Sequence, residues 1–181
     1  MKTTLVLATL FGGMLTFVSC SGKKEITADA PAAVPTASAA LTKVFATAPA
    51  GEPVAILQAR ANAQPGETVT LKGLVMGSSK PFVEGRAAFT LGDPHKLTPC
   101  NKNPDDGCKT PWDVCCDSAE DIKAATVTIQ VVDADGKVLK ESIENISGLK
   151  PLSEVTVTGT VTPASNADLL VLNATSIRVT P

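Results

Sequence analysis

Four cysteines lie close together in the middle of the chain, and these residues indicate chemistry most plainly. Seven residues separate the first from the second, six separate the second from the third, and the last two are adjacent. Thiol groups gathered in this way either pair as disulfides or bind a soft metal ion. No Cys-x-x-Cys pair of the kind used in thiol–disulfide exchange is present, so that activity is not expected. The four residues are Cys100, Cys108, Cys115 and Cys116.

Disulfide bonds are the first interpretation, because the cluster holds an even number of cysteines and the N-terminus of the chain indicates export. Neighbouring cysteines rarely pair with each other. Two arrangements therefore stay open: Cys100 with Cys115 and Cys108 with Cys116, or Cys100 with Cys116 and Cys108 with Cys115. Closing a loop of about 15 residues is worth roughly 3 kcal/mol. We expect two such bonds to order a long polar loop that has no core of its own.

A metal site is the alternative interpretation. The cysteine thiolates together with His95 would supply four or five ligands for zinc or copper. The cysteine spacing matches no standard zinc motif, however, and an oxidising compartment competes for thiols. His95 is the only histidine, and no serine-nucleophile motif accompanies it, so no catalytic triad can be assembled. The sequence therefore predicts a protein that is not an enzyme and needs no cofactor.

The segment Thr110-Pro111-Trp112-Asp113-Val114 lies between the second cysteine and the adjacent pair. Trp112 is the only tryptophan of the chain. We expect its ring to be exposed among acidic residues and, with Asp113, to contact a ligand. A protein or a glycan of the cell envelope would suit such a surface.

The composition limits what the chain can bind. Its 181 residues include 16 Lys and Arg against 18 Asp and Glu, which gives a formal net charge of −2. Only 3% of the residues are aromatic. Nucleic-acid binding is therefore not expected, since it needs a basic surface and aromatic rings on which bases stack. With 44% hydrophobic residues, the chain is nevertheless able to form a folded core.

The N-terminus has the pattern of a secretory signal peptide. Lys2 is followed by an uncharged apolar stretch over residues 5–18, which is too short for a membrane-spanning helix. The end of this stretch, Phe17-Val18-Ser19-Cys20, resembles the lipobox of bacterial lipoproteins. The resemblance implies removal of residues 1–19 and acylation of Cys20, with palmitate among the acyl chains. Two or three acyl chains hold a protein at a membrane, and Ser21 favours the outer membrane over the inner one.

Residues 20–50 are rich in Ala, Pro, Thr and Ser. Such a segment buries little apolar surface, so we expect a disordered tether between the lipid anchor and the folded domain. A helix over residues 39–48, bounded by Pro35 and Pro49, is the alternative. The folded domain is expected to span residues 51–181.

Within this domain, alternation of apolar and polar residues predicts five short strands. A helix of two to three turns is predicted after Pro53, before the first strand. Residues 133–137 are predicted to form a hairpin turn. Glycine in the middle of two strands suggests bends, and the last strand should carry a bulge. The expected strands are 69–75, 87–93, 125–132, 155–161 and 169–179, and the expected core residues are Val69, Leu71, Val75, Phe89, Val127, Ile129, Val157 and Val171.

Short strands bent at glycine predict an all-β domain with a minor helix, closed as a five-stranded barrel. From residue 54 to 180 the strand pattern resembles the OB-fold of the tRNA-anticodon-binding and exported-nuclease accessory type. The Cys-rich insertion, residues 93–121 between the second and third strands, resembles that of uncharacterised exported bacterial lipoproteins with a Thr-Pro-Trp-Asp-x-Cys-Cys loop. We therefore expect a lipid-anchored, non-catalytic binding or assembly module in the cell envelope. A metal-handling or redox lipoprotein that uses the cysteines and His95 is the alternative.

Overall fold

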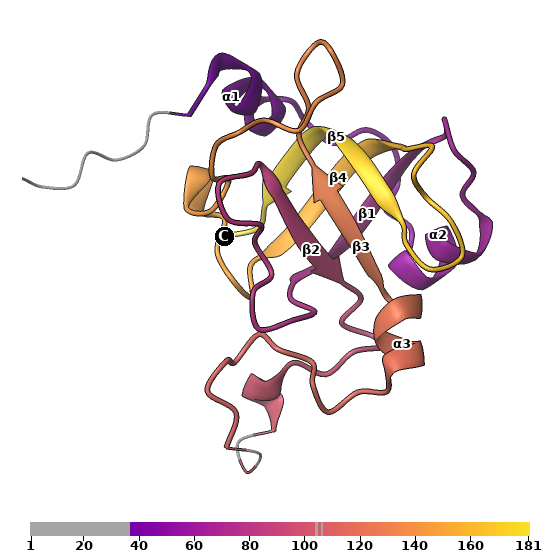
Figure 1. The fold of residues 1–181 in the computed structure, drawn as a ribbon, viewed down its shortest axis with the longest axis vertical. Helices are drawn as coiled ribbons and strands as arrows, with labels where there is room; N and C mark the ends of the chain where they lie inside the picture. Colours follow the sequence, from indigo (N-terminus) through magenta and orange to yellow (C-terminus); the bar gives the residue numbers. More distant parts are fainter. Residues whose placement is uncertain (1–36, 104, 106) are drawn as a thin grey trace, which may run out of the picture. The chain divides into compact units, whose positions relative to one another are not determined.

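The computed structural model describes residues 37–103, 105 and 107–181, and within them five strands close into a barrel (Figure 1). Hydrogen bonds join the strands in the order β1-β2-β3-β5-β4, and β4 returns to β1. Only the β3–β5 pair is parallel. The predicted all-β, OB-fold-like small barrel is confirmed. The strands are β1 (Thr68–Val75), β2 (Ala88–Gly92), β3 (Thr126–Gln130), β4 (Glu154–Val161) and β5 (Val171–Val179).

The signal peptide, Cys20 and the first part of the predicted tether lie outside the described residues. The helices of the described part are α1 (Ala39–Ala46), α2 (Ile56–Asn62) and α3 (Ala119–Ala124), with 3₁₀ turns η1 (Cys100–Lys102) and η3 (Ile146–Gly148). None of the helices in this part of the chain is long and apolar enough to cross a membrane. Helix α2 occupies the place where a helix was predicted after Pro53.

The barrel core consists of the apolar residues that alternate along the strands. Seven of the eight predicted core residues are buried, and Val69 is only half-buried. Val69 pairs with Gly159 across β1 and β4, so the residue directly opposite it has no side chain to cover it. The buried residues among those predicted are Leu71, Val75, Phe89, Val127, Ile129, Val157 and Val171.

The predicted bulge and the two mid-strand glycines are found together with the close strand contacts that require them. Between β4 and β5 the register shifts, since Thr158 pairs with Ser176 while Gly159 pairs with Ala174. A Cβ atom on Gly159 would lie 2.7 Å from the Asn173 carbonyl oxygen. At Gly73 the corresponding distance to the Gly92 carbonyl oxygen would be 2.6 Å. Both positions therefore exclude any side chain.

The prediction of a disordered tether is wrong for residues 39–46, which form helix α1. Ser38 caps the helix by accepting a hydrogen bond from the Leu41 N–H. Leu41 and Val44 are buried in the barrel core, and the Ser176 hydroxyl on β5 donates to the Thr47 carbonyl at 2.6 Å. The folded domain thus begins well before residue 51. The prediction failed because the composition of this segment concealed a short apolar stripe.

The Cys-rich insertion lies between β2 and β3, as predicted, and Figure 1 shows it projecting from one end of the barrel. It is not the coreless loop that the sequence suggested. Leu97, Val114 and Ala125 are buried against Met76, which follows the end of β1. Trp112 and Ile122 pack around this group. We call Met76, Leu97, Val114 and Ala125 the satellite core.

Replacing Leu41 with Ala should lower the free energy of unfolding by about 2–5 kcal/mol, because the side chain is fully buried. The matched control Lys43→Ala changes an exposed residue of the same helix and should alter it by less than about 0.5 kcal/mol. Urea unfolding followed by circular dichroism measures both values. Equal stability of the two variants would show that α1 is not part of the folded domain.

Candidate functional site

The two ends of the insertion are fixed to neighbouring strands. Gly92 at the end of β2 pairs with Thr126 at the start of β3, and the Asp93 N–H donates to the Ala125 carbonyl at 2.9 Å. Asp93 is buried, with 3% of its surface exposed. Its carboxylate accepts the His95 N–H at 3.0 Å and its carbonyl accepts the Leu97 N–H at 2.9 Å. The chain is therefore turned tightly at the start of the insertion.

Further along, two parts of the insertion are joined side by side by hydrogen bonds. The Cys100 N–H donates to the Asp113 carbonyl at 2.8 Å, and the Asn101 N–H donates to the Pro111 carbonyl at 2.9 Å. A third bond runs from the Thr98 N–H to the Asp117 carboxylate at 2.9 Å. These contacts bring the first cysteine next to the adjacent cysteine pair.

The Thr-Pro-Trp-Asp segment shapes the loop that carries this pair. The Asp113 N–H donates to the Thr110 carbonyl at 3.0 Å, which closes a turn. The Asp113 carboxylate accepts the Val114 N–H at 2.8 Å, and Val114 is fully buried. Asp113 is half-buried, and its carboxylate accepts a hydrogen bond from within the loop.

Trp112 is half-buried, in contrast to the exposed ring expected from the sequence. Its indole N–H donates to the Ser79 carbonyl at 3.0 Å, and its ring packs against the satellite core. The ring is drawn inwards because the neighbouring Val114 is part of that core. Trp112 therefore joins the insertion to the segment that follows β1.

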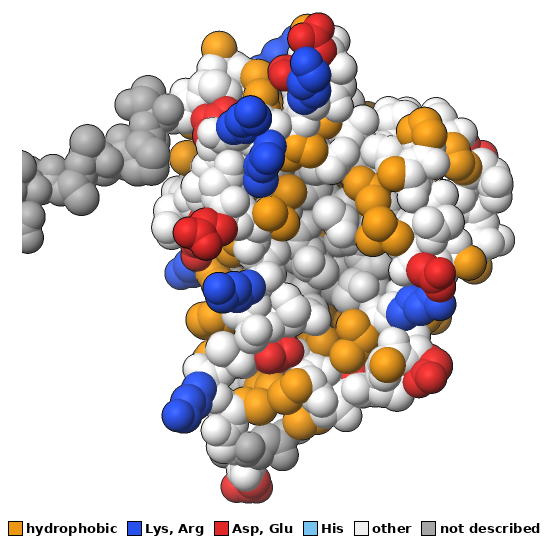
Figure 2. Space-filling view, in the orientation of Figure 1, with side chains coloured by type: hydrophobic (Ala, Val, Ile, Leu, Met, Phe, Trp, Pro, Cys, Tyr) orange, Lys and Arg blue, Asp and Glu red, His pale blue; other side chains and the backbone are white. Residues whose placement is uncertain are grey.

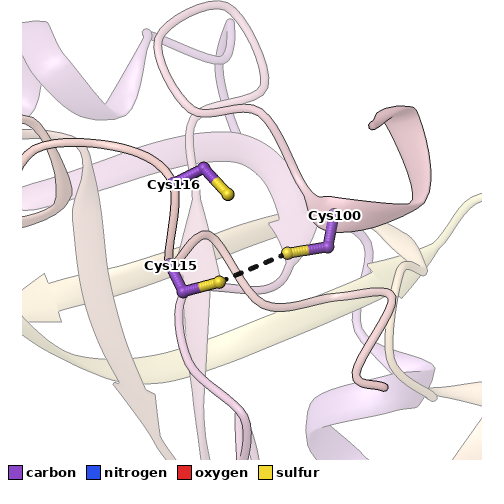
Figure 3. Close-up of side chains that lie close together, drawn as sticks. All are labelled: Cys100, Cys115 and Cys116. Atoms are coloured by element: carbon purple, nitrogen blue, oxygen red, sulfur yellow. Dashed lines mark hydrogen bonds between the residues drawn. The ribbon is translucent and has the colours of Figure 1, made fainter. Parts of the chain in front are cut away.

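The cysteine sulfur atoms converge (Figure 3). The Cys115 sulfur lies 3.6 Å from that of Cys100 and 3.3 Å from that of Cys108. The sulfur atoms of Cys100, Cys115 and Cys116 all lie within 4.8 Å of one another. Cys100 comes from the turn η1 and is buried, whereas Cys115 and Cys116 are exposed. The structure contains no disulfide among its described residues, so neither predicted pairing is formed in it.

The surroundings of Cys100 and Cys108 raise the pKa of both thiols as long as no cation is present. Hydrogen bonding with Cys108, burial and contact with Cys115 raise the pKa of the Cys100 thiol to about 12. For Cys108, the hydrogen bond with Cys100 lowers the pKa, but Cys115 and burial outweigh it, so the net shift is upwards. Each thiolate would lie next to other electron-rich sulfur atoms. A bound cation reverses this balance and stabilises the thiolates.

His95 lies apart from the cysteine cluster. It lines a cavity of about 510 Å³ together with Asp93, Lys72 and Glu154, and it is not among the residues whose ligand atoms group with the cysteines. The Lys72 ammonium lies 2.9 Å from the Glu154 carboxylate. It holds the pKa of Glu154 below its ordinary value. The structure thus does not bring His95 into the ligand set that the sequence suggested.

A groove of about 360 Å³ lies beside the insertion, and Trp112 forms part of its wall. Pro81, Phe82 and Pro151 supply further apolar surface, and Glu144 supplies a negative charge. Phe82 also packs on Phe89 in the barrel, with 6.0 Å between ring centroids. On the face drawn in Figure 2, basic and acidic side chains are scattered among one another.

Comparison with known protein families, with curated proteins and with solved structures found no match to this chain.

Sequence reasoning missed the residues that hold the cysteines in place. Leu97 and Val114 are isolated apolar residues in a polar segment, so no periodic pattern marks them. Helix α3 did leave a signal, because Ser118 precedes Asp121 by three residues, a pattern typical of a helix start. The Ser118 hydroxyl indeed accepts the Asp121 N–H at 3.1 Å.

In the reduced, metal-free chain, iodoacetamide should alkylate Cys100 more slowly than the exposed Cys115 at pH 8. Cys100 is buried, and its pKa of about 12 keeps it protonated at that pH. Because the thiolate is the reacting form, its rate should rise about tenfold per pH unit until close to pH 12. Peptide mass spectrometry follows the rate for each cysteine, with the urea-unfolded chain as control. A plateau for Cys100 near pH 9 would contradict the raised pKa.

Proposed function

We propose that the Cys-rich insertion binds a soft or borderline metal ion, zinc or copper(I), through the thiolates of Cys100, Cys115 and Cys116, whose sulfur atoms group together. Cys108 lies outside that group but beside Cys115, and we propose it as the fourth ligand. The observation that carries the proposal is the separation of the sulfur atoms, 3.3 Å and 3.6 Å from Cys115. In a tetrahedral site with zinc–sulfur bonds of about 2.3 Å, sulfur ligands lie about 3.8 Å apart. A disulfide needs about 2.0 Å. The observed separations are closer to those of metal ligands.

The way the insertion is built also supports a metal site. The satellite core and the hydrogen bonds of Cys100 and Asn101 hold the insertion in shape, so disulfides are not needed for that purpose. One ligand, Cys100, is buried and two, Cys115 and Cys116, are exposed. A metal ion can therefore enter and leave from the solvent side without any opening of the barrel.

We place this function in the cell envelope. The export signal over residues 1–19 and the lipobox-like sequence ending at Cys20 support a lipid-anchored protein, with the outer membrane favoured by Ser21. The barrel then serves as a non-catalytic carrier for the metal-binding insertion. No chemical reaction is part of the proposal.

A second candidate function is that of a binding module for an envelope protein or glycan. The groove beside Trp112 favours it, because two aromatic side chains, two prolines, two glutamates and a lysine line one concave surface. This groove is adjacent to the insertion, so a ligand bound there would lie near the metal site.

Titrating the reduced full chain with zinc tests the metal site. The wild-type chain should bind one equivalent. Cys115→Ser should lose at least about tenfold in affinity, because even groups outside the ligand set cost that much when removed. The matched control His95→Asn changes the other suggested ligand and should bind as the wild type does, since His95 lines a different cavity. Isothermal titration calorimetry measures all three.

Three outcomes would contradict the proposal. Equal affinity of the wild-type and Cys115→Ser chains would remove the cluster from zinc binding. Loss of binding in His95→Asn would place the ligands elsewhere. If mass spectrometry of the exported protein finds it four hydrogen masses lighter than the fully reduced chain, the four cysteines form two disulfides, as the first interpretation of the sequence has it.

A further inference from the structure

The sulfur atoms of Cys108 and Cys100 lie at different distances from that of Cys115. That of Cys108 is the nearer, at 3.3 Å, and that of Cys100 lies at 3.6 Å. Both separations are short enough that a modest movement of the backbone would bring the atoms to bonding distance. The neighbour that can move at the lower cost therefore decides which disulfide an oxidant produces.

Cys100 is held firmly by its surroundings. Its N–H donates to the Asp113 carbonyl at 2.8 Å, and its own carbonyl accepts the Asn103 N–H at 3.0 Å. Only 4% of its surface is exposed. Moving Cys100 towards Cys115 would break a bond that joins the two parts of the insertion and would disturb the turn η1.

Cys108 is held far less. Among the described residues of the insertion, no backbone hydrogen bond involves Cys108. The preceding Gly107 has a φ of 63°, and no atom lies within 4 Å of the place where its Cβ would be. Cys108 is half-buried and Cys115 is exposed, so a small disulfide from solution can reach this pair. As far as the described residues go, the approach of Cys108 to Cys115 breaks no backbone hydrogen bond of Cys108 and meets no packed side chain at residue 107.

We propose that oxidation releases the metal through a disulfide between Cys108 and Cys115, an inference that rests on the metal site proposed above. A low-molecular-weight disulfide RSSR is the oxidant. The Cys115 thiolate attacks one sulfur of RSSR, forming a mixed disulfide and expelling RS⁻. The Cys108 thiolate then attacks the Cys115 sulfur, which forms the Cys108–Cys115 bond and expels the second RS⁻.

The electrons balance in this sequence of steps. Two cysteine thiolates lose two electrons in total, and RSSR gains two as it becomes two thiolates. Zinc keeps its charge of 2+, because it has no redox chemistry in proteins. It loses two of its four ligands and leaves as the hydrated ion, while Cys100 and Cys116 keep their sulfur atoms in the reduced form. The site is thus emptied by oxidation and restored by reduction.

Treating the zinc-loaded full chain with oxidised glutathione tests the inference. One equivalent of zinc should appear in a colorimetric chelator assay, and peptide mass spectrometry should find Cys108 joined to Cys115. Cys108→Ser, which keeps the size of the side chain, should instead accumulate the mixed disulfide between Cys115 and glutathione, because the resolving thiolate is missing. Zinc retained by the oxidised wild-type chain, or released with a different disulfide, would overturn the inference but leave the metal site intact.

Oxidation of the metal-free chain tests the cysteine pairing independently of zinc binding. The reduced chain without zinc receives half an equivalent of oxidised glutathione, and the first disulfide is mapped. The bond between Cys108 and Cys115 should be the main product, because Cys100 is held by backbone hydrogen bonds and Cys108 is held less firmly. A first bond that includes Cys100 would overturn the inference even if Cys108→Ser binds zinc too weakly to be loaded. Failure of the wild-type chain to bind zinc at all would instead overturn the proposed function, and the release with it.

Discussion

The pairing of Gly92 with Thr126 constrains the whole functional region. Because these residues face each other across β2 and β3, the insertion must leave the barrel and return to it at the same place. Its two halves therefore run side by side, and the hydrogen bonds of Cys100 and Asn101 to the other half become possible. Closure of the barrel, which fixes the β2–β3 pair, is the condition for bringing the cysteines together.

Two separate apolar cores stabilise this molecule. The barrel core, which includes Leu41 of α1, stabilises the strands, while the satellite core orders the insertion. Met76 belongs to the satellite core and directly follows β1, so it links the insertion to the barrel. Since apolar packing already orders the insertion, its thiols are available for chemistry. This is the physical reason to prefer ligands over structural crosslinks.

The sequence predicted the barrel well because strand alternation is a local pattern. The five strands, the bulge in β5 and the glycines at 73 and 159 could all be identified from neighbouring residues. A helix at the position of α1 was only the alternative to a disordered tether, because Leu41 and Val44 are stabilised by packing on a barrel whose strands are remote in sequence.

The candidate site was predictable in its residues but not in its geometry. The four cysteines are evident in the sequence. Their convergence, however, depends on hydrogen bonds between residues far apart in the loop. His95 is only five residues before Cys100, but the turn at Asp93 directs it to a different cavity. Trp112 was expected at the surface, and the burial of Val114 draws it inwards. Such long-range contacts leave no periodic signal in a sequence.

X-ray absorption spectroscopy of the zinc-loaded full chain tests the central claim most directly, because it reports the atoms bound to the metal. If the four cysteines are the ligands, the spectrum should show a single shell of sulfur atoms at about 2.3 Å from zinc. A shell of nitrogen or oxygen atoms at about 2.0–2.1 Å, with the scattering pattern of an imidazole ring, would contradict the assignment.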